Sequence, residues 1–339
     1  MTAAQGTVTM GDVARLAGVS KMTVSNVVNN RPGVSEPVRR RVLEVVRESG
    51  YRLNVSARTL RSGRTGVLGL AVPHVNSSYF GLLAEHVIEE AARRGFHIAI
   101  EQTGAAAEGE FEAIAQSHKL QFDGLILSAS GLDPQDQRLV GGGIPMVMLG
   151  ERDFAASFDH VAMPNEEGTK AATEHLIDRG CRRIAIVTGA VRGEDVNVVT
   201  RRHHGYLAAL LERGMAADAA LLEPLDAMTA EGGRRAAHRL VDSGREVDGV
   251  VAVTDGVAQG LLRGFADRGV RVPEDVRLIG FDDIPEAALM VPSLSTVSPD
   301  HRWMAAKAIE LVAARIDDPE RAATEHTAPF TIVARESTR

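Results

Sequence analysis

A run of polar side chains follows a tight-turn signal near the N-terminus, and these side chains are suited to reading DNA. The turn signal is Gly18-Val19-Ser20. In a helix-turn-helix, a first helix braces a second helix whose exposed N-terminal side chains reach the major groove. The spacing therefore predicts a recognition helix, and a helical hairpin without a DNA role is the alternative. The side chains expected to be exposed on this helix are Lys21, Met22, Thr23, Ser25 and Asn26.

Three short helices are expected to position this run. Apolar residues recur at helical spacing, as Val24, Val27 and Val28 do in the second helix, so that each helix can bury one stripe against its neighbours. A hydroxyl side chain precedes each helix and can cap it, in turn Thr9, Ser20 and Ser35. The expected helices are Gly11–Ala17, Lys21 to about Asn29, and Glu36–Ser49.

The net charge of −7 is divided unevenly along the 339 residues. Residues 1–66 carry 11 basic and 4 acidic side chains, whereas residues 67–339 carry 27 basic and 41 acidic ones. A net charge of +7 suits a surface that meets phosphate groups, and a net charge of −14 does not. The charge division supports DNA binding by the first part and indicates a boundary near residue 66.

Short apolar runs alternate with amphipathic helical patterns from Val67 onward. This alternation predicts parallel sheets covered by helices on both faces. The runs are too many for one small sheet, so two stacked α/β lobes are expected, with a ligand cleft at the carboxyl ends of the strands. The expected strands are Gly66–Val72, Phe96–Glu101, Gly124–Leu127, Pro145–Leu149, Arg183–Thr188, Gly249–Val253 and Val276–Phe281. The expected helices lie near residues 80–94, 109–119, 166–179, 200–213, 231–243 and 255–267.

Residue counts and missing motifs exclude several classes of protein. The single cysteine, Cys181, rules out an intrachain disulfide framework and a multi-thiolate metal site. The sequence lacks a nucleophile elbow, a Walker loop and a His-Glu-x-x-His pattern. No apolar run reaches the roughly 18 residues that a membrane helix needs, and no signal peptide opens the chain. We therefore expect a cytoplasmic protein that is not an enzyme and has no metal and no cofactor.

Together these motifs resemble the LacI/GalR family of transcriptional regulators over nearly the whole chain. The resemblance is carried by Val8–Ala14, Ala17–Ser20, Thr23–Ser25, Thr65–Gly69 and Gly269–Asp283. It implies an all-α helix-turn-helix domain followed by an α/β bilobal domain of the periplasmic-binding-protein type. The implied domains are residues 1–53 for DNA binding, 54–66 for a hinge helix and linker, and 67–339 for effector binding and dimerisation. Lobe 1 would comprise about 67–162 plus 294–320, and lobe 2 about 163–293 plus 321–339.

The resemblance assigns DNA contacts to the first domain and to the hinge. Lys21 and Met22 match positions that read base edges, where lysine can donate to guanine and methionine can contact a thymine methyl group. Asn26 stands where relatives very often carry arginine. Leu60 matches a residue that hinge helices insert between base steps, which kinks DNA; a buried residue of an interdomain helix is the alternative. The remaining implied contacts are Thr23, Ser25, Asn29, Ser35, Asn54 and Ala57.

The resemblance also assigns effector contacts. Arg202 matches the family's effector-binding arginine, and Asp282 matches its acidic partner. Fixed guanidinium and carboxylate groups suit ligands with paired hydroxyl groups or ring nitrogens; a structural salt bridge is the alternative. The other implied effector contacts are His74, Tyr79, Phe80, Ser128, Ser130, Thr254 and Asp255. For Tyr79 and Phe80, a role in the core or in a dimer interface is the alternative.

The resemblance implies a homodimeric regulator, most often a repressor, that binds pseudo-palindromic double-stranded operator DNA and no membrane. A small carbohydrate-like effector between the lobes would control its operator affinity. Met228 aligns where many sugar-responsive members carry an aromatic ring, and the position of Trp303 relative to the cleft is open. Two alternatives remain: a sugar-binding receptor or enzyme on the same bilobal fold, and a constitutive repressor without an effector.

Overall fold

A computed structural model describes residues 8–28, 32–51, 63–133, 143–150, 154, 158–191 and 196–339. The chain forms two compact units, residues 1–65 and residues 66–339. No helix among the described residues is long and apolar enough to cross a membrane.

The first unit contains the three predicted helices, α1 (Met10–Ala17), α2 (Lys21–Val28) and α3 (Glu36–Ser49). Thr9 caps α1 as predicted: its hydroxyl accepts from the backbone N–H of Asp12, whose carboxylate in turn accepts from the backbone N–H of Thr9. Gly18 ends α1 in the left-handed region, with φ of 64°. The helices enclose one small core, formed by Val13, Ala14, Ala17, Val24, Val27, Val42 and Tyr51.

The described residues of the second unit form two six-stranded sheets, in agreement with the predicted pair of α/β lobes. The first sheet has the order β11-β5-β4-β3-β1-β2, and all its strands are parallel. Its strands are β1 (Val67–Val72), β2 (His97–Gln102), β3 (Gly124–Ser128), β4 (Met146–Leu149), β5 (Asp159–Ala162) and β11 (Glu325–Thr327).

The second sheet has the order β12-β10-β9-β8-β6-β7 and is parallel except where β12 pairs with β10. Its strands are β6 (Ile184–Gly189), β7 (Leu222–Leu225), β8 (Gly249–Ala252), β9 (Arg277–Phe281), β10 (Ser295–Pro299) and β12 (Phe330–Val333). Because parallel strands end at the same edge, each lobe presents the loops that follow its strands along one carboxyl edge.

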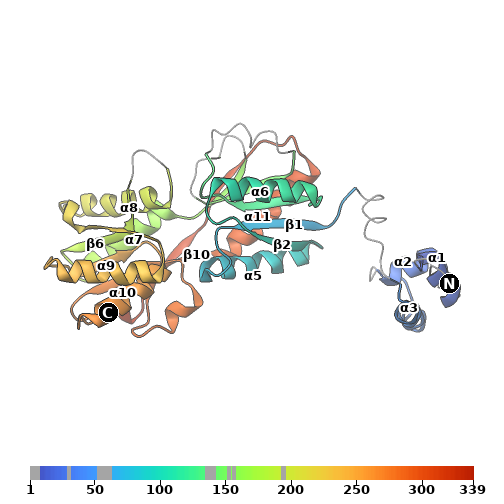
Figure 1. The fold of residues 1–339 in the computed structure, drawn as a ribbon, viewed down its shortest axis with the longest axis horizontal. Helices are drawn as coiled ribbons and strands as arrows, with labels where there is room; N and C mark the ends of the chain where they lie inside the picture. The colour runs from blue at the N-terminus through green and yellow to red at the C-terminus, as the bar shows by residue number, and fades with distance from the viewer. Residues whose placement is uncertain are drawn as a thin grey trace, which may run out of the picture. The chain divides into compact units, whose positions relative to one another are not determined.

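Helices cover both faces of each sheet (Figure 1). On the first sheet, α6 (Ala107–Lys119) lies opposite α5 (Ser78–Arg93) and α11 (His301–Asp317). On the second sheet, α7 (Asn165–Asp178) and α8 (Val198–Glu212) cover one face. The other face packs against α9 (Ala230–Asp242) and α10 (Asp255–Asp267). Short 3-10 turns occur at Ala219–Leu221, Pro285–Ala288 and Glu336–Thr338.

The sheets divide the C-terminal part differently from the predicted lobe limits. β10 belongs to the second sheet although residues 294–320 were predicted for lobe 1, and β11 belongs to the first sheet although residues 321–339 were predicted for lobe 2. The described chain therefore passes between the sheets after β5, after β10 and after β11. These strands were missed because polar residues or proline interrupt their short apolar stretches.

Candidate DNA-binding and effector sites

The recognition helix begins with two exposed side chains of the predicted types. Ser20 caps α2, since its Oγ accepts from the backbone N–H of Thr23 at 3.0 Å and lies 2.9 Å from the Thr23 hydroxyl. Val24 and Val27 face the core, so Lys21 and Met22 are left in solvent, with Met22 68% exposed. This arrangement can present a cation and an apolar side chain to base edges.

Other predicted DNA contacts differ in their surroundings. Ser25 was predicted to be exposed, but it is only 9% exposed because it lies next to the buried stripe of α2. The Thr23 hydroxyl takes part in the Ser20 cap, which gives it a helix-ordering role. Asn26 is half-buried, and Ser35 is exposed in front of α3. Four predicted contacts lie outside the described residues: Asn29, Asn54, Ala57 and Leu60.

The predicted arginine and aspartate of the effector site meet in the second lobe. Arg202 lies on α8, and Asp282 follows β9 at the carboxyl edge of the sheet. Their closest atoms, Nη2 and Oδ1, are 3.7 Å apart, and the two side chains are 3% and 7% exposed. Because buried charges are costly unless they are paired and hydrogen-bonded, this pair must be supported by further contacts.

Several further contacts hold Arg202, and one of them is from its Nη2 to Sδ of Met163 at 3.8 Å. Its Nε donates to Oδ1 of Asn165 at 2.7 Å, and its Nη1 donates to the backbone carbonyl of Val253. Its guanidinium carbon lies 3.5 Å from the centre of the Phe281 ring, a cation–π contact. Asn165 was left out of the predicted contacts, because Pro164-Asn165 stands where the resemblance to the family implies Asp-Asn.

Asp282 occupies an unusual backbone conformation with its own supports. Its φ is 120°, a region that side-chain-bearing residues rarely adopt. Its backbone N–H donates to the carbonyl of Val297 at 2.9 Å, and its carbonyl accepts from Nε2 of His301 at 2.5 Å. Burial lowers the pKa of His301, which favours the neutral imidazole that can donate this bond. His301, the first residue of α11, was not predicted as part of the site.

The first lobe places polar and aromatic side chains at its own carboxyl edge. Tyr79 packs against two apolar clusters: one lies within the second lobe and includes Val187, and the other is shared by both lobes and includes Leu83 and Leu176. Its ring centre is 5.6 Å from that of His301. Ser128 ends β3, and the loop after it is held by the buried carboxylate of Glu110, which accepts from the backbone N–H of Ser130 at 2.7 Å. His74 is exposed in the loop after β1.

The two lobes also touch through an exposed hydrogen bond. The hydroxyl of Ser78, at the start of α5, donates to Oε1 of Glu286 at 3.0 Å. Ser78 belongs to the first lobe and Glu286 to the 3-10 turn after β9 in the second. A change in the angle between the lobes would change this contact.

Two predicted effector contacts make structural bonds instead. The Thr254 hydroxyl caps α10 by accepting from the backbone N–H of Val257 at 3.2 Å. Asp255 is fully buried; its carboxylate accepts from the Thr296 hydroxyl at 2.7 Å and from the backbone N–H of Ile284 at 3.0 Å. Burial raises the pKa of Asp255 to about 6. Both carboxylate oxygens are thus engaged inside the lobe, and we leave Asp255 out of the proposed effector contacts.

Phe80 also differs from the prediction. It lines a groove of about 430 Å³ on α5 and β2, together with Val75, Ile88 and Ile100. These three aliphatic side chains are 55%, 45% and 44% exposed. Such an exposed apolar groove is typical of a protein–protein contact, the alternative role considered for Phe80.

Trp303 and Met228, whose positions relative to the cleft were open, lie outside the groove on α5 and β2. Trp303 is half-buried on α11 and packs against the cluster shared by the lobes. Met228 is 50% exposed in the loop between β7 and α9.

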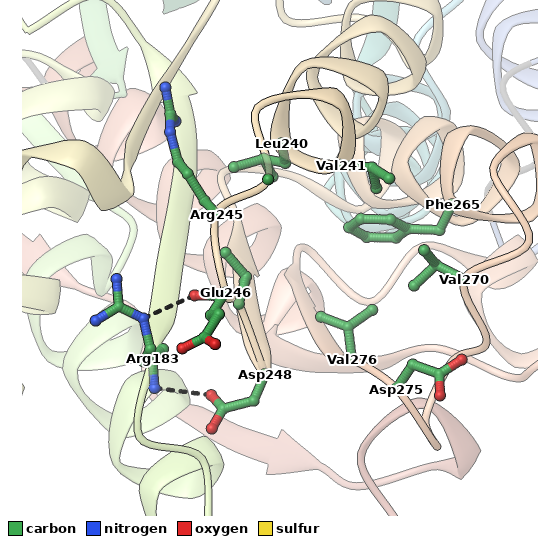
Figure 2. Close-up of a pocket in the computed structure, with 12 residues that line it drawn as sticks. Arg183, Leu240, Val241, Arg245, Glu246, Asp248, Phe265, Val270, Asp275 and Val276 are labelled. Atoms are coloured by element: carbon green, nitrogen blue, oxygen red, sulfur yellow. Dashed lines mark hydrogen bonds between the residues drawn. The ribbon is translucent and has the colours of Figure 1, made fainter.

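A second cavity, of about 510 Å³, lies at the opposite end of the second sheet, where β6, β8 and β9 begin (Figure 2). Its floor contains the buried side chains Leu240, Phe265 and Val276. Two cations of its wall bond within the protein: Arg183 donates to the backbone carbonyl of Glu246, and Arg245 donates to the carboxylate of Glu223. The residues described include no group of carboxylates, histidines and cysteine that could hold a metal ion.

Comparisons with known proteins agree with this organisation. Residues 9–54 match the bacterial regulatory proteins of the lacI family, and residues 173–338 match a periplasmic binding protein-like domain. The chain is 30% identical to the ribose operon repressor of Halalkalibacterium halodurans, over 98% of this chain and 97% of the relative. A solved structure described as a LacI-family transcriptional regulator of Sanguibacter keddieii is 40% identical over 81% of this chain and 99% of its own, with a TM-score of 0.74. A complex of the transcriptional regulator CelR with cellobiose is 29% identical over 97% of this chain and 99% of its own, with a TM-score of 0.72.

A helix-turn-helix unit joined to a bilobal α/β unit is the organisation of the bacterial regulatory proteins that this chain matches. With a relative of at least 30% identity over nearly its full length, the chain belongs to the LacI family of bacterial regulatory proteins. It is a DNA-binding transcriptional regulator rather than an enzyme.

Proposed function

We propose that this protein is a repressor whose affinity for operator DNA is controlled by a carbohydrate-like effector bound between its two lobes. The observation that carries this proposal is the buried pair Arg202 and Asp282 at the carboxyl edge of the second lobe. A guanidinium group and a carboxylate held in fixed positions suit vicinal hydroxyl groups, because one group donates and the other accepts. The names of a ribose operon repressor and of a cellobiose complex among the relatives support this class of ligand.

The proposed effector site lies between the carboxyl edges of the two sheets. Arg202 and Asp282 would bind the ligand from the second lobe, and His74, Tyr79, Ser128 and Ser130 would approach it from the first. Tyr79 already packs against apolar residues of both lobes, so a ligand that changes the angle between the lobes would also change its packing. Ligand affinity and operator affinity must then be coupled reciprocally.

The proposed DNA contacts are those of the recognition helix and the hinge. Lys21 and Met22 would read base edges in the major groove, and Leu60 would insert between base steps at the centre of the operator. The effector would act by changing whether the hinge orders on DNA. Since operator DNA is its target, we expect the protein to work in the cytoplasm.

Two copies are proposed to form a homodimer, because two recognition helices related by twofold symmetry match a pseudo-palindromic operator. The groove on α5 and β2 is the surface we assign to this contact in the first lobe. Its exposed Val75, Ile88 and Ile100 would be covered by the same residues of a second copy.

Removal of the first unit tests the proposal. A variant without residues 1–65 retains the compact second unit. It should bind ribose or cellobiose with the affinity of the full chain, as measured by calorimetry, and should no longer shift an operator duplex. If the variant without residues 1–65 still shifted the operator duplex, the proposed assignment of DNA binding to the first unit would be contradicted.

A further inference from the structure

Asn165 lies at a junction between the connection of the two lobes and the effector pair. It is the first residue of α7 and follows Met163 and Pro164, which lead out of β5. It is only 1% exposed, which is as buried as its neighbour Arg202. Its backbone N–H donates to the carbonyl of Met163 at 2.8 Å, and its Nδ2 donates to the same carbonyl at 3.3 Å.

These two bonds fix which way the amide points. Because Nδ2 donates to a carbonyl group, Oδ1 must point to the opposite side, where it can only accept. The donor it meets is Nε of Arg202 at 2.7 Å. The guanidinium group is thus fixed by Asn165 at Nε, by the Val253 carbonyl at Nη1 and by the Phe281 ring against its face. Its Nη2 lies 3.7 Å from Oδ1 of Asp282 and also donates to Sδ of Met163 at 3.8 Å.

We propose that Asn165 is a positioning residue for the effector site, which sets the plane of the Arg202 guanidinium group so that its Nη2 edge and the Asp282 carboxylate can bind neighbouring hydroxyl groups together. This inference rests on the proposed function of Arg202. A planar guanidinium group forms paired bonds only in the correct plane, and so a rotated group would lose both bonds. Without the acceptor on Asn165, the buried Nε–H of Arg202 would lose that partner, and the guanidinium group could rotate out of its present plane.

The same amide ties Arg202 to the chain segment between the lobes. Asn165 holds the carbonyl of Met163 with its nitrogen and Arg202 with its oxygen. Met163 immediately follows β5, the last strand of the first sheet before the chain enters the second lobe. A shift of the guanidinium group on ligand binding would therefore be transmitted through Asn165 to this connection.

The Nε–H of Arg202 gives a test that needs no ligand. We would record ¹H–¹⁵N spectra of the full chain with ¹⁵N-labelled arginine, and assign the Arg202 signal by its loss in Arg202→Lys. Wild type should show an Nε–H that exchanges slowly with water. Asn165→Leu, which has similar volume but no acceptor, should accelerate exchange at least about tenfold, and Asn165→Ala should do the same if the leucine variant folds poorly. Asn165→Asp retains an acceptor and should restore slow exchange, whereas Glu167→Ala on the exposed face of α7 should have no effect.

Ligand binding supplies the second measurement, with ribose and cellobiose as probes. Asn165→Leu should weaken binding of the probe at least about tenfold and leave operator affinity without ligand unchanged, while Asn165→Asp should bind nearly as wild type does. Rapid Nε–H exchange in wild type, or unchanged exchange in the leucine and alanine variants, would overturn the positioning role. Failure of both sugars to bind wild type would contradict the proposed effector class. It would not bear on the role of Asn165, because the exchange measurement tests that role without a ligand.

Discussion

Nη2 of Arg202 lies 3.7 Å from Oδ1 of Asp282, and both side chains are almost entirely buried in the second lobe. The two residues come from different elements, α8 and the loop after β9. A buried ion pair contributes little net stability once its desolvation is counted. The presence of this pair, together with the strained φ of 120° at Asp282, supports our proposal that the two residues bind a ligand.

Replacement of Arg202 tests the effector site. Arg202→Lys keeps the charge but removes the planar fork, and we expect it to weaken sugar binding by about ten- to one-hundredfold, since a hydrogen bond to a charged group contributes about 1.5–3 kcal/mol. Operator affinity without sugar should not change. Arg213→Lys, which affects a more exposed cation paired with Asp178 at the end of the same helix, is the control. Calorimetry and DNA titration measure the two affinities, and an unaltered sugar affinity would remove Arg202 from the site.

The recognition helix can be tested at its first residue. Lys21→Ala should cost about 1–3 kcal/mol of operator binding and relax the base preference at one position. Arg15→Ala removes an exposed cation of α1 that pairs with Asp12, and should leave the base preference intact. Fluorescence anisotropy with singly substituted duplexes measures both effects. An equal loss of affinity for every duplex would mean that Lys21 contacts phosphate only.

The hinge prediction concerns a residue outside the described part of the chain. Leu60→Ala should reduce specific operator affinity by at least about tenfold, because the lost wedge no longer supports the DNA kink. Nonspecific affinity should change much less. Leu43→Ala, at an exposed leucine of α3, is the matched control. Equal losses on specific and random duplexes in the same titration would contradict the assignment of Leu60.

Asp255 gives a prediction about pH. Its pKa is about 6 in the folded chain against an ordinary value of 3.8, so the folded state binds more protons than the unfolded state between about pH 4 and pH 6. The free energy of unfolding should therefore fall as pH rises through this window, by up to about 1.4 kcal/mol per pH unit from this group. Asp255→Asn should remove that contribution and be at least as stable as wild type at pH 7.5.

Urea unfolding at several pH values measures this difference, with Asp275→Asn as control. The pKa of Asp275 is lowered to about 2 by its bonds to Arg271, so its stabilising contribution is already complete above about pH 4. The difference between wild type and this control should stay flat between pH 4 and pH 6. A flat difference for Asp255→Asn as well would show that Asp255 is ionised throughout this window in the folded state.

The dimer contact can be tested at Ile88, a 45% exposed residue in the groove on α5 and β2. Ile88→Glu would place two like charges across a symmetric apolar contact, and we expect dimer dissociation to become at least about tenfold easier. Leu211→Glu changes a 79% exposed leucine on α8 and serves as the control. Sedimentation equilibrium gives both constants; a stable Ile88→Glu dimer would exclude this groove from the interface.

The sequence predicted the elements whose local signals are strong. Helices α1 and α2 have hydroxyl caps and apolar stripes, whereas Ser35 makes no side-chain cap bond to α3. The seven predicted apolar runs all became strands. Strands β5, β7, β10, β11 and β12 were not predicted, because polar residues or proline interrupt their apolar stretches, whereas β4 and β8, with only four residues, are apolar throughout. Without β10 and β11, the limits of the lobes near residues 294 and 321 could not be placed.

The effector site shows the same division between local and long-range information. Arg202 and Asp282 were predicted because they match positions of a family pattern. The bonds by which Asn165 supports Arg202 and His301 supports Asp282 were not predicted, because they join residues 37 and 19 positions apart and depend on how helices and strands pack. Asp255 was misjudged for the same reason: its partner Thr296 lies on β10, a strand that the sequence did not reveal.

The central claim is that a sugar bound by the second unit changes operator affinity. The most direct measurement selects a binding site from a random duplex library with the full chain, and then titrates that duplex without sugar and with ribose or cellobiose. We predict a pseudo-palindromic site and a change in its dissociation constant of at least about fivefold with one of the sugars. A dissociation constant that is the same in all three titrations, for a protein that calorimetry shows to be saturated with sugar, would contradict the account.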